Sequence, residues 1–391
     1  MTWGAPKYKV LHNFGSSKDG TLPYGPLLLD AKGDLYGVTA TGGGSGCGGY
    51  GCGTVFGLTG KSNGKWTETV LHAFADNGDG AIPESNLVSD AQGNLYGTTK
   101  GDVGGPAVFE LMPGSGGWDL SLIYTKGNNP GLLLGQTDIL YGSIGPGGIG
   151  ELSPGSKGWT YTDLYDFCGP GLEWGGDQSP TTCRDGNLME SPLNWDAQGN
   201  LYGTTLYGGD MHCDGGWGCG VAFQMTPNGD GTWTYHVLHR FGSFKQDGQL
   251  PAAGLVLDAA GNAYGVTWSG GQYNCGNIFE LVPSDGRWKE TVLYNFRGTE
   301  GCGPLYTLAF DAAGALYGMA QGGDKKCGPC GVIFKLARQK SGKWKYSVLH
   351  TFHGPEGADP YGVILDGNGN IFGTAEEGGK YNLGVAFEIT Q

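Results

Sequence analysis

The amino-acid sequence predicts an all-β protein, a seven-bladed β-propeller with four antiparallel strands in each blade. Three observations support this fold: one strand-like segment occurs seven times, two other segments keep step with it, and no helical periodicity interrupts the order. Repeats of about 45 to 62 residues with four strands each are typical of propeller blades. We expect residues 1–391 to form a single domain of this kind.

The composition is typical of a folded protein with many tight turns. Gly accounts for 80 of the 391 residues, while Pro, at 19, is ordinary and no Gly-X-Y period occurs, which excludes collagen. Aromatic residues at 12% and charged residues at 15% describe a chain that can bury a large core. The many glycines are therefore expected in turns.

Each repeat is expected to hold strands A to D, rich in β-branched and aromatic residues. In one repeat, strand A at 255–258 leads through the tight turn 259–262 into strand B. The copies of strand B are 35–39, 95–99, 140–143, 201–205, 263–267, 316–319 and 371–375. The copies of strand C are 53–56, 107–109, 148–152, 220–223, 276–279, 331–334 and 384–387. Strand D occurs at 10–14, 70–74, 237–241, 292–296 and 348–352, with weaker copies near Tyr124 and Tyr165.

The two ends of the chain are expected to close the ring. The last repeat ends at Gln391 after its strand C, whereas the chain opens with a lone strand D over residues 8–14. The N-terminal strand can complete the last blade and cover a sheet edge that would otherwise promote aggregation.

The Leu-Tyr-Gly-Thr-Thr, Gly-x-Val-Phe-x-Leu and Val-Leu-His-x-Phe segments resemble the GloVer-type tandem-repeat family of predicted secreted bacterial β-propellers. The resemblance covers essentially the whole chain, with a shorter repeat at about residues 120–155. It implies the propeller fold and secretion. It implies no chemistry, because the family is defined by its repeat and propellers carry many functions.

Residue types that recur at one blade position are best explained by the blade itself. A Trp opens strand D, a His follows within that strand, and an Asp precedes the A–B turn, where it is expected to cap the turn. The Trp series is Trp66, Trp118, Trp159, Trp233, Trp288 and Trp344. The His series is His12, His72, His239 and His350, with Tyr294 in the fifth blade. The Asp series is Asp30, Asp90, Asp196, Asp258, Asp311 and Asp366.

All ten Cys are expected on one face. In an up-down-up-down blade the B–C loops and the D-to-A connections share a face, and every Cys lies in one of them. Their even number predicts disulfides and an oxidising compartment, extracellular or periplasmic. Nearest-neighbour pairing gives the hypothetical bonds Cys47–Cys52, Cys168–Cys183, Cys213–Cys219, Cys275–Cys302 and Cys327–Cys330.

Charge and hydropathy exclude two classes of partner. A net charge of −14 and a pI near 4.8 would repel a phosphate backbone, so no nucleic acid is expected. No apolar run is long enough for a membrane helix. The chain runs from Met1 through Trp3 into a strand without a targeting signal, as in a mature form whose signal has been removed. No pattern predicts an oligomeric state.

No cofactor or metal is expected. The motif Cys327-Gly328-Pro329-Cys330 lacks the following helix that activates a redox pair. A zinc site of His212, Cys213 and Cys219 has no standard spacing. The calcium-like segment 76–80 has Gly at its third ligand position, so a turn is favoured.

The candidate binding residues break the repeat and lie on the Cys-rich face near the axis. At the start of strand A they are Tyr24, Glu84, Glu190, Tyr306 and Tyr361, with Ala252 and Ala253 in the fifth blade. After strand B and in nearby loops they are Lys100, Trp268, Gln321, Glu376, Trp174, Arg184, Tyr207, His212, Trp217 and Tyr273. This aromatic, acidic and amide set suits a carbohydrate, whose apolar ring face packs on aromatics.

Three functions remain open. The first is a secreted propeller that binds a carbohydrate or another extracellular ligand around the central channel. The second is a carbohydrate-active enzyme: Glu84 and Glu190 could act as acid and base of a glycosidase, or Tyr and His could serve a lyase with Arg184, Lys100 and His212. The third is a non-catalytic interaction scaffold. No Ser-centred elbow, phosphate loop or zincin motif occurs.

Overall fold

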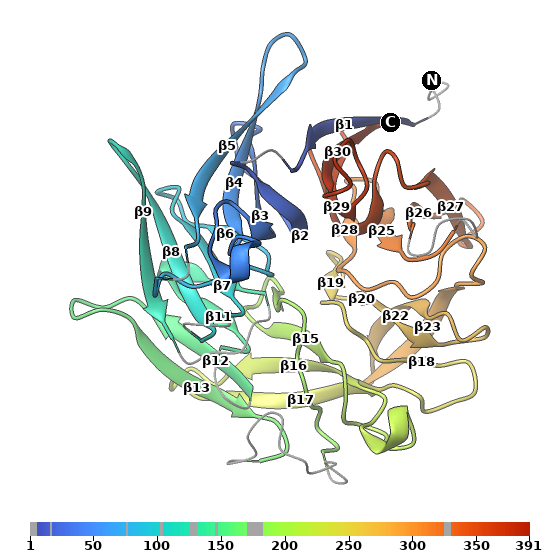
Figure 1. Ribbon diagram of the computed structural model, residues 1–391. Helices are drawn as coiled ribbons and strands as arrows, with labels where there is room; N and C mark the ends of the chain where they lie inside the picture. The colour runs from blue at the N-terminus through green and yellow to red at the C-terminus, as the bar shows by residue number, and fades with distance from the viewer. Residues whose placement is uncertain are drawn as a thin grey trace.

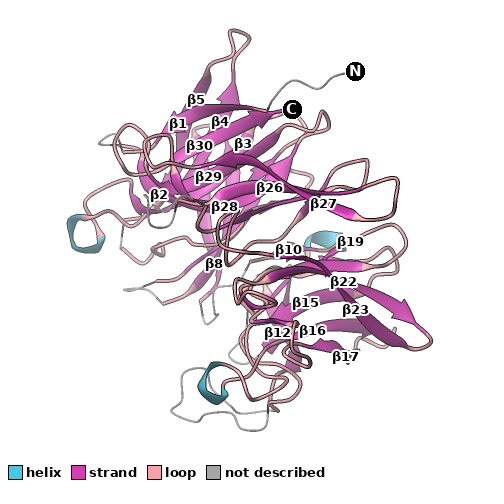
Figure 2. Ribbon diagram, turned by 90° about the vertical axis from the view of Figure 1, so that its right-hand side faces the viewer, coloured by secondary structure: helices cyan, strands magenta, loops and turns pink. Residues whose placement is uncertain are grey.

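The computed structural model describes residues 6–15, 18–75, 77–101, 105–125, 131–144, 148–169, 183–323 and 330–391. Seven four-stranded antiparallel sheets surround a central axis, as the sequence predicts (Figure 1). Within the described residues, the helical elements are three 3-10 turns, Cys47–Gly49, Gln136–Asp138 and Asp214–Gly216; Figure 2 shows strands and loops making up the rest.

The first six blades follow the chain, each with strands A to D in order. Blade 1 contains β2 (Gly20–Leu29), β3 (Leu35–Gly42), β4 (Thr54–Gly60) and β5 (Trp66–Ala73). Blade 2 contains β6 (Val88–Ser89), β7 (Leu95–Thr99), β8 (Ala107–Gly114) and β9 (Gly117–Tyr124). Blade 3 contains β10 (Leu133–Leu134), β11 (Leu140–Gly142), β12 (Gly148–Ser153) and β13 (Thr160–Asp166).

The next three blades repeat this arrangement. Blade 4 contains β14 (Asn194–Trp195), β15 (Leu201–Thr205), β16 (Val221–Pro227) and β17 (Trp233–Arg240). Blade 5 contains β19 (Val256–Leu257), β20 (Ala263–Thr267), β22 (Asn277–Ser284) and β23 (Arg287–Asn295). A small ribbon of β18 (Gly248–Gln249) and β21 (Ser269–Gly270) accompanies it. Blade 6 contains β24 (Ala309–Phe310), β25 (Leu316–Ala320), β26 (Val332–Arg338) and β27 (Trp344–Thr351).

Blade 7 joins the two ends of the chain. It contains β28 (Ala358–Leu365), β29 (Ile371–Glu377) and β30 (Val385–Thr390), and the N-terminal strand β1 (Lys7–Asn13) pairs antiparallel with β30. The register runs from Lys7 opposite Thr390 to Asn13 opposite Val385. Figure 1 shows β1 beside β30. The predicted ring closure is therefore confirmed.

A glycine–phenylalanine pair explains the Tyr-Gly repeat. In blade 5, Gly265 of β20 lies opposite Phe279 of β22, and a Cβ atom on Gly265 would lie 2.5 Å from the phenyl Cζ. The ring covers the glycine, so a side chain has no room there. Five further blades repeat the pair: Gly37–Phe56, Gly97–Phe109, Gly203–Phe223, Gly318–Phe334 and Gly373–Phe387. In blade 3, Gly142 lies opposite Gly150 instead, which explains its degenerate repeat.

The recurring Asp caps the A–B turn, as predicted. In blade 2, Asp90 Oδ1 accepts hydrogen bonds from the backbone N–H of Gln92 at 3.0 Å and of Asn94 at 2.8 Å. The Tyr96 hydroxyl donates to Asp90 Oδ2 at 3.1 Å, which ties the turn to strand B. The same two backbone contacts occur at Asp30, Asp196, Asp258, Asp311 and Asp366.

The recurring Trp joins neighbouring blades. Trp118 of blade 2 packs edge-on against Tyr36 of blade 1, with ring centroids 6.5 Å apart, and Trp66 packs on Phe372 of blade 7 at 6.1 Å. The other pairs are Trp159–Tyr96, Trp233–Tyr141, Trp288–Tyr202 and Trp344–Tyr264. The predicted packing role of this series is confirmed.

The recurring His pairs with an acidic residue in the connection to the next blade. His72 Nε2 lies 3.2 Å from Asp79 Oδ2, and Asp79 also accepts a hydrogen bond from the backbone N–H of Ala75. Asp79 thus anchors a turn in the calcium-like segment, of which Asp76 lies outside the described residues. The equivalent pairs are His12–Asp19, His239–Asp247 and His350–Glu356, with Tyr294–Glu300 in blade 5.

Candidate functional site

The inner strands of the blades enclose a cavity of about 660 Å³ on the ring axis. Residues at the start of strand A line it because these strands are innermost and point their first residues at the channel mouth. Of the predicted site residues, Tyr24, Glu84, Lys100, Glu190 and Tyr306 line this cavity together. They come from blades 1, 2, 4 and 6, so the propeller ring is what brings them together.

Three tyrosines form a cluster on one side of the cavity. The Tyr361 ring lies 4.5 Å from Tyr24 and 4.9 Å from Tyr306, measured between centroids. The Tyr361 hydroxyl donates a 2.6 Å hydrogen bond to Glu376 Oε2. Tyr361 is itself buried, at 6% exposure, so it supports the two rings that face the cavity.

Acidic side chains surround the Tyr24 hydroxyl. Burial, followed by the charges of Glu84, Glu376 and Glu190, raises the pKa of Tyr24 to about 12. A phenol in such surroundings stays protonated at neutral pH and acts as a hydrogen-bond donor. The Tyr24 hydroxyl is therefore a neutral donor near three acids.

The two predicted catalytic carboxylates differ in their surroundings. Glu84 forms an ion pair with Lys100, whose Nζ lies 3.2 Å from Glu84 Oε2. Glu190 is open to the cavity, yet the surrounding protein displaces water around it, and this desolvation raises its pKa; the Lys100 charge partly offsets the effect. The cavity thus holds one carboxylate in an ion pair and a second one, Glu190, whose pKa is raised.

A further acid, Asp359, belongs to the same mouth and is absent from the residues picked out by sequence. The Gln321 side chain donates to Asp359 Oδ1 at 3.4 Å. Burial, followed by the charge of Glu376, raises the pKa of Asp359 to about 6. Its backbone is left-handed, with φ at +52°, like the residues at the same blade position, Leu22, Ile82, Leu188 and Leu250. The sequence did contain a signal for Asp359, because four other blades have an aliphatic residue at the position where this blade has an acid.

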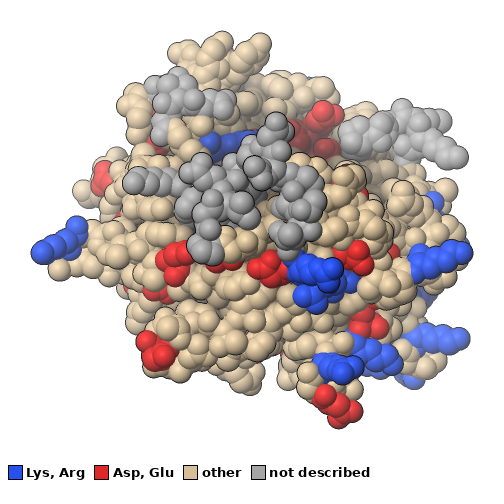
Figure 3. Space-filling view, turned by 90° about the horizontal axis from the view of Figure 1, so that it is seen from below, with Lys and Arg blue, Asp and Glu red and all other residues tan. Residues whose placement is uncertain are grey.

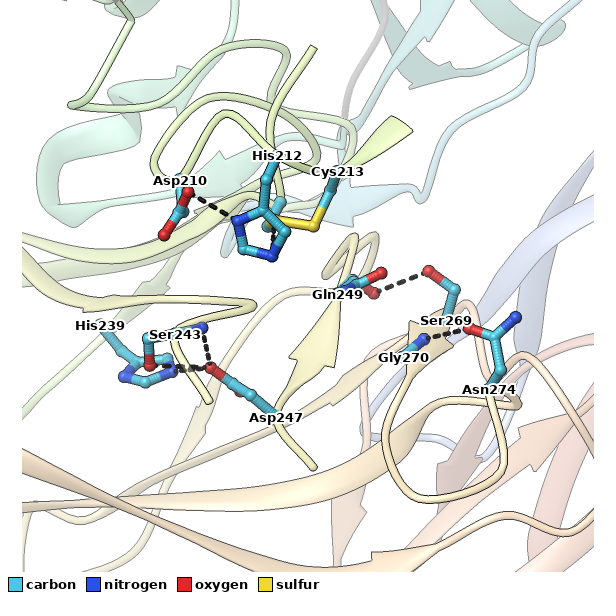
Figure 4. The surroundings of a disulfide bond; sticks show 11 residues. Asp210, His212, Cys213, His239, Ser243, Asp247, Gln249, Ser269, Gly270 and Asn274 are labelled. Atoms are coloured by element: carbon cyan, nitrogen blue, oxygen red, sulfur yellow. Dashed lines mark hydrogen bonds and ion pairs between the residues drawn. A yellow bond between two sulfur atoms is a disulfide. The ribbon is translucent and has the colours of Figure 1, made fainter. Parts of the chain in front are cut away.

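His212 and Arg184 lie away from the central cavity. His212 Nδ1 is 2.7 Å from Asp210 Oδ1, and its ring borders a hollow of about 450 Å³ between blades 4 and 5 (Figure 4). Arg184 is exposed, and its charge helps lower the pKa of Asp210, after the hydrogen bond from His212. The lyase set of Arg184, Lys100 and His212 is therefore divided between two places.

The predicted aromatic residues of the loops are partly exposed. Trp217 is 40% exposed and contacts Tyr207, with ring centroids 5.9 Å apart. Trp268 is 45% exposed and packs beside Gly303. Tyr273 lies under the Arg297 guanidinium, 5.4 Å from the ring centroid. Trp174 lies outside the described residues.

Four disulfides pin the loops of the elaborated face. The bonds Cys47–Cys52, Cys168–Cys183, Cys213–Cys219 and Cys275–Cys302 match the predicted pairing. Cys213 and Cys219 are bonded to each other and are not available as zinc ligands beside His212 (Figure 4). Cys327 lies outside the described residues, and with it the fifth predicted pair.

The repeat and the ring agree with a family match. A model of the Gloeobacter/Verrucomicrobia repeat matches residues 187–391, which is more than half of the chain. The chain belongs to this repeat family. No curated protein matches it in sequence.

Solved propellers resemble the fold at low sequence identity. A candidate 6-phosphogluconolactonase from Bacteroides uniformis is 14% identical with a TM-score of 0.52, over 88% of this chain and 89% of that one. The periplasmic gluconolactonase of Pseudomonas aeruginosa is 15% identical with a TM-score of 0.49, over 85% of both chains. A candidate gluconolactonase is 13% identical with a TM-score of 0.42, over 98% and 91%. At such low identity the similarity to the Bacteroides protein supports the propeller fold alone, and the two structures with TM-scores below 0.5 support no further conclusion.

Figure 3 shows one face on which acidic and basic side chains are interspersed among mostly uncharged residues. Within the described part of the chain, no helix has the length and apolar character needed to cross a membrane.

Proposed function

We propose that this propeller is a secreted protein that binds a carbohydrate in its central cavity. The observation that carries the proposal is the mouth itself, where the tyrosines Tyr24 and Tyr306 lie beside Glu84, Lys100 and Glu190 around a space of about 660 Å³. That volume suits a small ligand such as one or a few sugar rings.

The chemistry of the mouth matches that of a sugar. An aromatic face covers the apolar C–H face of a pyranose ring, while carboxylates accept hydrogen bonds from hydroxyls. The neutral Tyr24 hydroxyl and the Lys100 ammonium supply donors to ring and hydroxyl oxygens. The tight support of Tyr361 by Glu376 holds the tyrosine cluster in place before a ligand arrives, which lowers the ordering cost of binding.

Secretion is supported by the disulfides and by membership of the repeat family. The structure has four disulfides, and disulfides form and persist chiefly in oxidising compartments, such as the periplasm or the outside of the cell. The Bacteroides propeller is named for a lactone of a phosphorylated sugar acid, but this likeness supports the fold alone. The sugar proposal therefore depends on the cavity.

Hydrolysis of a glycoside is the second candidate, favoured by the unequal carboxylates. Glu190, with its raised pKa, would be the proton donor to a leaving oxygen, and the ion-paired Glu84 the base or nucleophile. Environments that separate the protonation of two acids are typical of acid–base pairs.

A glycan array followed by titration calorimetry tests the binding proposal. We expect Glu84→Gln and Tyr24→Ala to weaken binding of a detected glycan about 10- to 100-fold, since each removes a hydrogen-bonding or stacking partner. Trp217→Ala, outside the lining of the cavity, is the matched control and should change the affinity less than about twofold. Equal losses in all three variants, or none, would contradict the central site.

The same ligands test the enzyme candidate. Reducing-end release from each bound polysaccharide is measured for wild type, Glu190→Gln and Glu84→Gln. Hydrolysis that falls at least about 100-fold in both variants supports catalysis. Binding without product in the wild type leaves the binding proposal standing and rejects the enzyme.

A further inference from the structure

A second cluster of chemically active side chains lies between blades 4 and 5, away from the central cavity. His239 comes from β17, Asp247 from the connection after it, and Glu290 from β23 of the next blade. His239 Nε2 lies 3.1 Å from Asp247 Oδ2 and 3.7 Å from Glu290 Oε2. One nitrogen or oxygen of each residue lies within 4.8 Å of the others.

Three carboxylate oxygens of this cluster are buried without a hydrogen-bond partner among the described residues. They are Asp247 Oδ1 and both Glu290 oxygens, Oε1 and Oε2. The side chain of Asp247 is 0% exposed and that of Glu290 is 2% exposed. Buried, unpaired carboxylate oxygens are costly, so this arrangement calls for a cation.

A single shared proton satisfies the cluster only in part. One proton joins one donor oxygen to one acceptor oxygen, and a third oxygen would stay unpaired. The other oxygen of Asp247, Oδ2, accepts two hydrogen bonds from Ser243, one from its backbone N–H at 2.8 Å and one from its side-chain hydroxyl at 3.0 Å. The same oxygen faces His239 (Figure 4). Asp247 is thereby held with Oδ2 beside His239 Nε2, and an ion bound between these two atoms would replace their direct contact.

We propose that His239, Asp247 and Glu290 bind a divalent transition metal such as zinc, which links blade 4 to blade 5. Tetrahedral zinc with bonds of about 2.0 to 2.2 Å places neighbouring ligand atoms about 3.3 Å apart. The 3.1 and 3.7 Å separations lie on either side of that value. One imidazole with two carboxylates is a zinc-type ligand set, whereas calcium prefers oxygen ligands alone.

The structure offers an ion both a path to the cluster and a fourth ligand. A hollow of about 720 Å³ reaches His239 and Glu290 and is bordered by Phe244 and Trp288. Three protein ligands leave one position of a tetrahedral ion for water or for the Ser243 hydroxyl.

The repeat itself shows what is special about this place. At the position of Glu290, opposite a Leu, Ile or Met of strand C, four other blades carry a tyrosine: Tyr8, Tyr161, Tyr235 and Tyr346. Blade 2 carries Leu120 there, beside a His72–Asp79 pair of the same kind as His239–Asp247. Blade 1 carries Glu68, but His12, Asp19 and Glu68 are not among the described groups with three ligand atoms within 4.8 Å.

The test is zinc binding to the chelator-treated, disulfide-intact protein, measured by calorimetry and thermal unfolding. We expect one equivalent of Zn²⁺ to bind and to raise the unfolding midpoint by about 3 °C at a hundredfold excess over Kd. Glu290→Gln and Asp247→Asn should each weaken binding at least about tenfold. Glu68→Gln and His212→Ala should bind zinc as the wild type does.

A second measurement keeps the proposal testable if a variant does not fold. Co²⁺ bound to the wild type at a four-coordinate His/carboxylate site gives a strong visible absorption band, and added Zn²⁺ should remove it. A wild type that binds neither ion more tightly than about 0.1 mM overturns the proposal. Zinc binding that is lost in His212→Ala or Glu68→Gln, and kept in Glu290→Gln, also overturns it.

Discussion

Replacing Glu68 by Gln should make the protein more stable at alkaline pH. Glu68 lies in β5, and its Oε1 atom is buried without a hydrogen-bond partner among the described residues. Burial, followed by the charge of Asp19, raises its pKa from 4.5 to about 7. The folded state therefore binds this proton more tightly than the unfolded state does.

The sign of the pH dependence follows from that difference. The proton stabilises the fold fully below about pH 4.5, and this contribution is lost as the pH rises through about 7. The difference in pKa corresponds to about 3 kcal/mol for a completely buried group. Because the Glu68 side chain is only partly buried, we expect about 1 to 2 kcal/mol.

Thermal unfolding at about pH 5 and about pH 8 measures the effect. Gln keeps the volume of Glu without its charge, so Glu68→Gln should unfold about 1 to 3 °C above the wild type at the higher pH. At the lower pH the two proteins should differ little. Glu377→Gln, at an exposed position of β29, is the matched control and should follow the wild type at both. A Glu68→Gln protein that is less stable than the wild type at about pH 8 would refute the reasoning.

Two further predictions concern the scaffold. The double variant Cys275→Ser/Cys302→Ser opens a loop with a sequence separation of 27 and should lose about 3 to 4 kcal/mol of unfolding free energy in denaturant titrations, whereas a reductant should then affect it less than the wild type. Gly265→Ala places a methyl group 2.5 Å from Phe279 Cζ and should cost about 1 to 3 kcal/mol, while Gly44→Ala, with no atom within 4 Å of its Cβ, should cost under about 0.5 kcal/mol; equal losses would contradict the packing explanation.

The fold could be predicted because each repeated residue has one local task. Gly265 makes room for Phe279, Asp90 caps the turn before strand B, and Trp118 reaches the neighbouring blade. Such tasks act within one blade or between adjacent blades and recur from blade to blade, so they leave a visible period in the sequence. The nearest-neighbour disulfides are local in the same way, and the four described pairs follow the prediction.

The candidate site could be predicted only in part, because its members come from blades far apart in the chain. Strand position placed Tyr24, Glu84, Lys100, Glu190 and Tyr306 around one cavity. The same reasoning could not separate them from His212 and Arg184, which share the face but lie farther from the axis. The distance of a loop residue from the axis depends on the path of its loop. The loops differ from blade to blade, so their paths produce no repeating pattern in the sequence.

Departures from the repeat point to chemistry more reliably than residue type alone. Asp359 stands where Leu22 and Ile82 adopt the same left-handed backbone, so nothing in the blade requires an acid there. Glu290 stands where Tyr235 and Tyr346 pack against the preceding blade, and in place of that stacking it has two carboxylate oxygens without a hydrogen-bond partner among the described residues. At Glu290 the change gives up stacking that other blades keep. We infer that an acid replaces the usual residue where it serves a function. For Asp359 that function is at the channel mouth, and for Glu290 it is the proposed metal site.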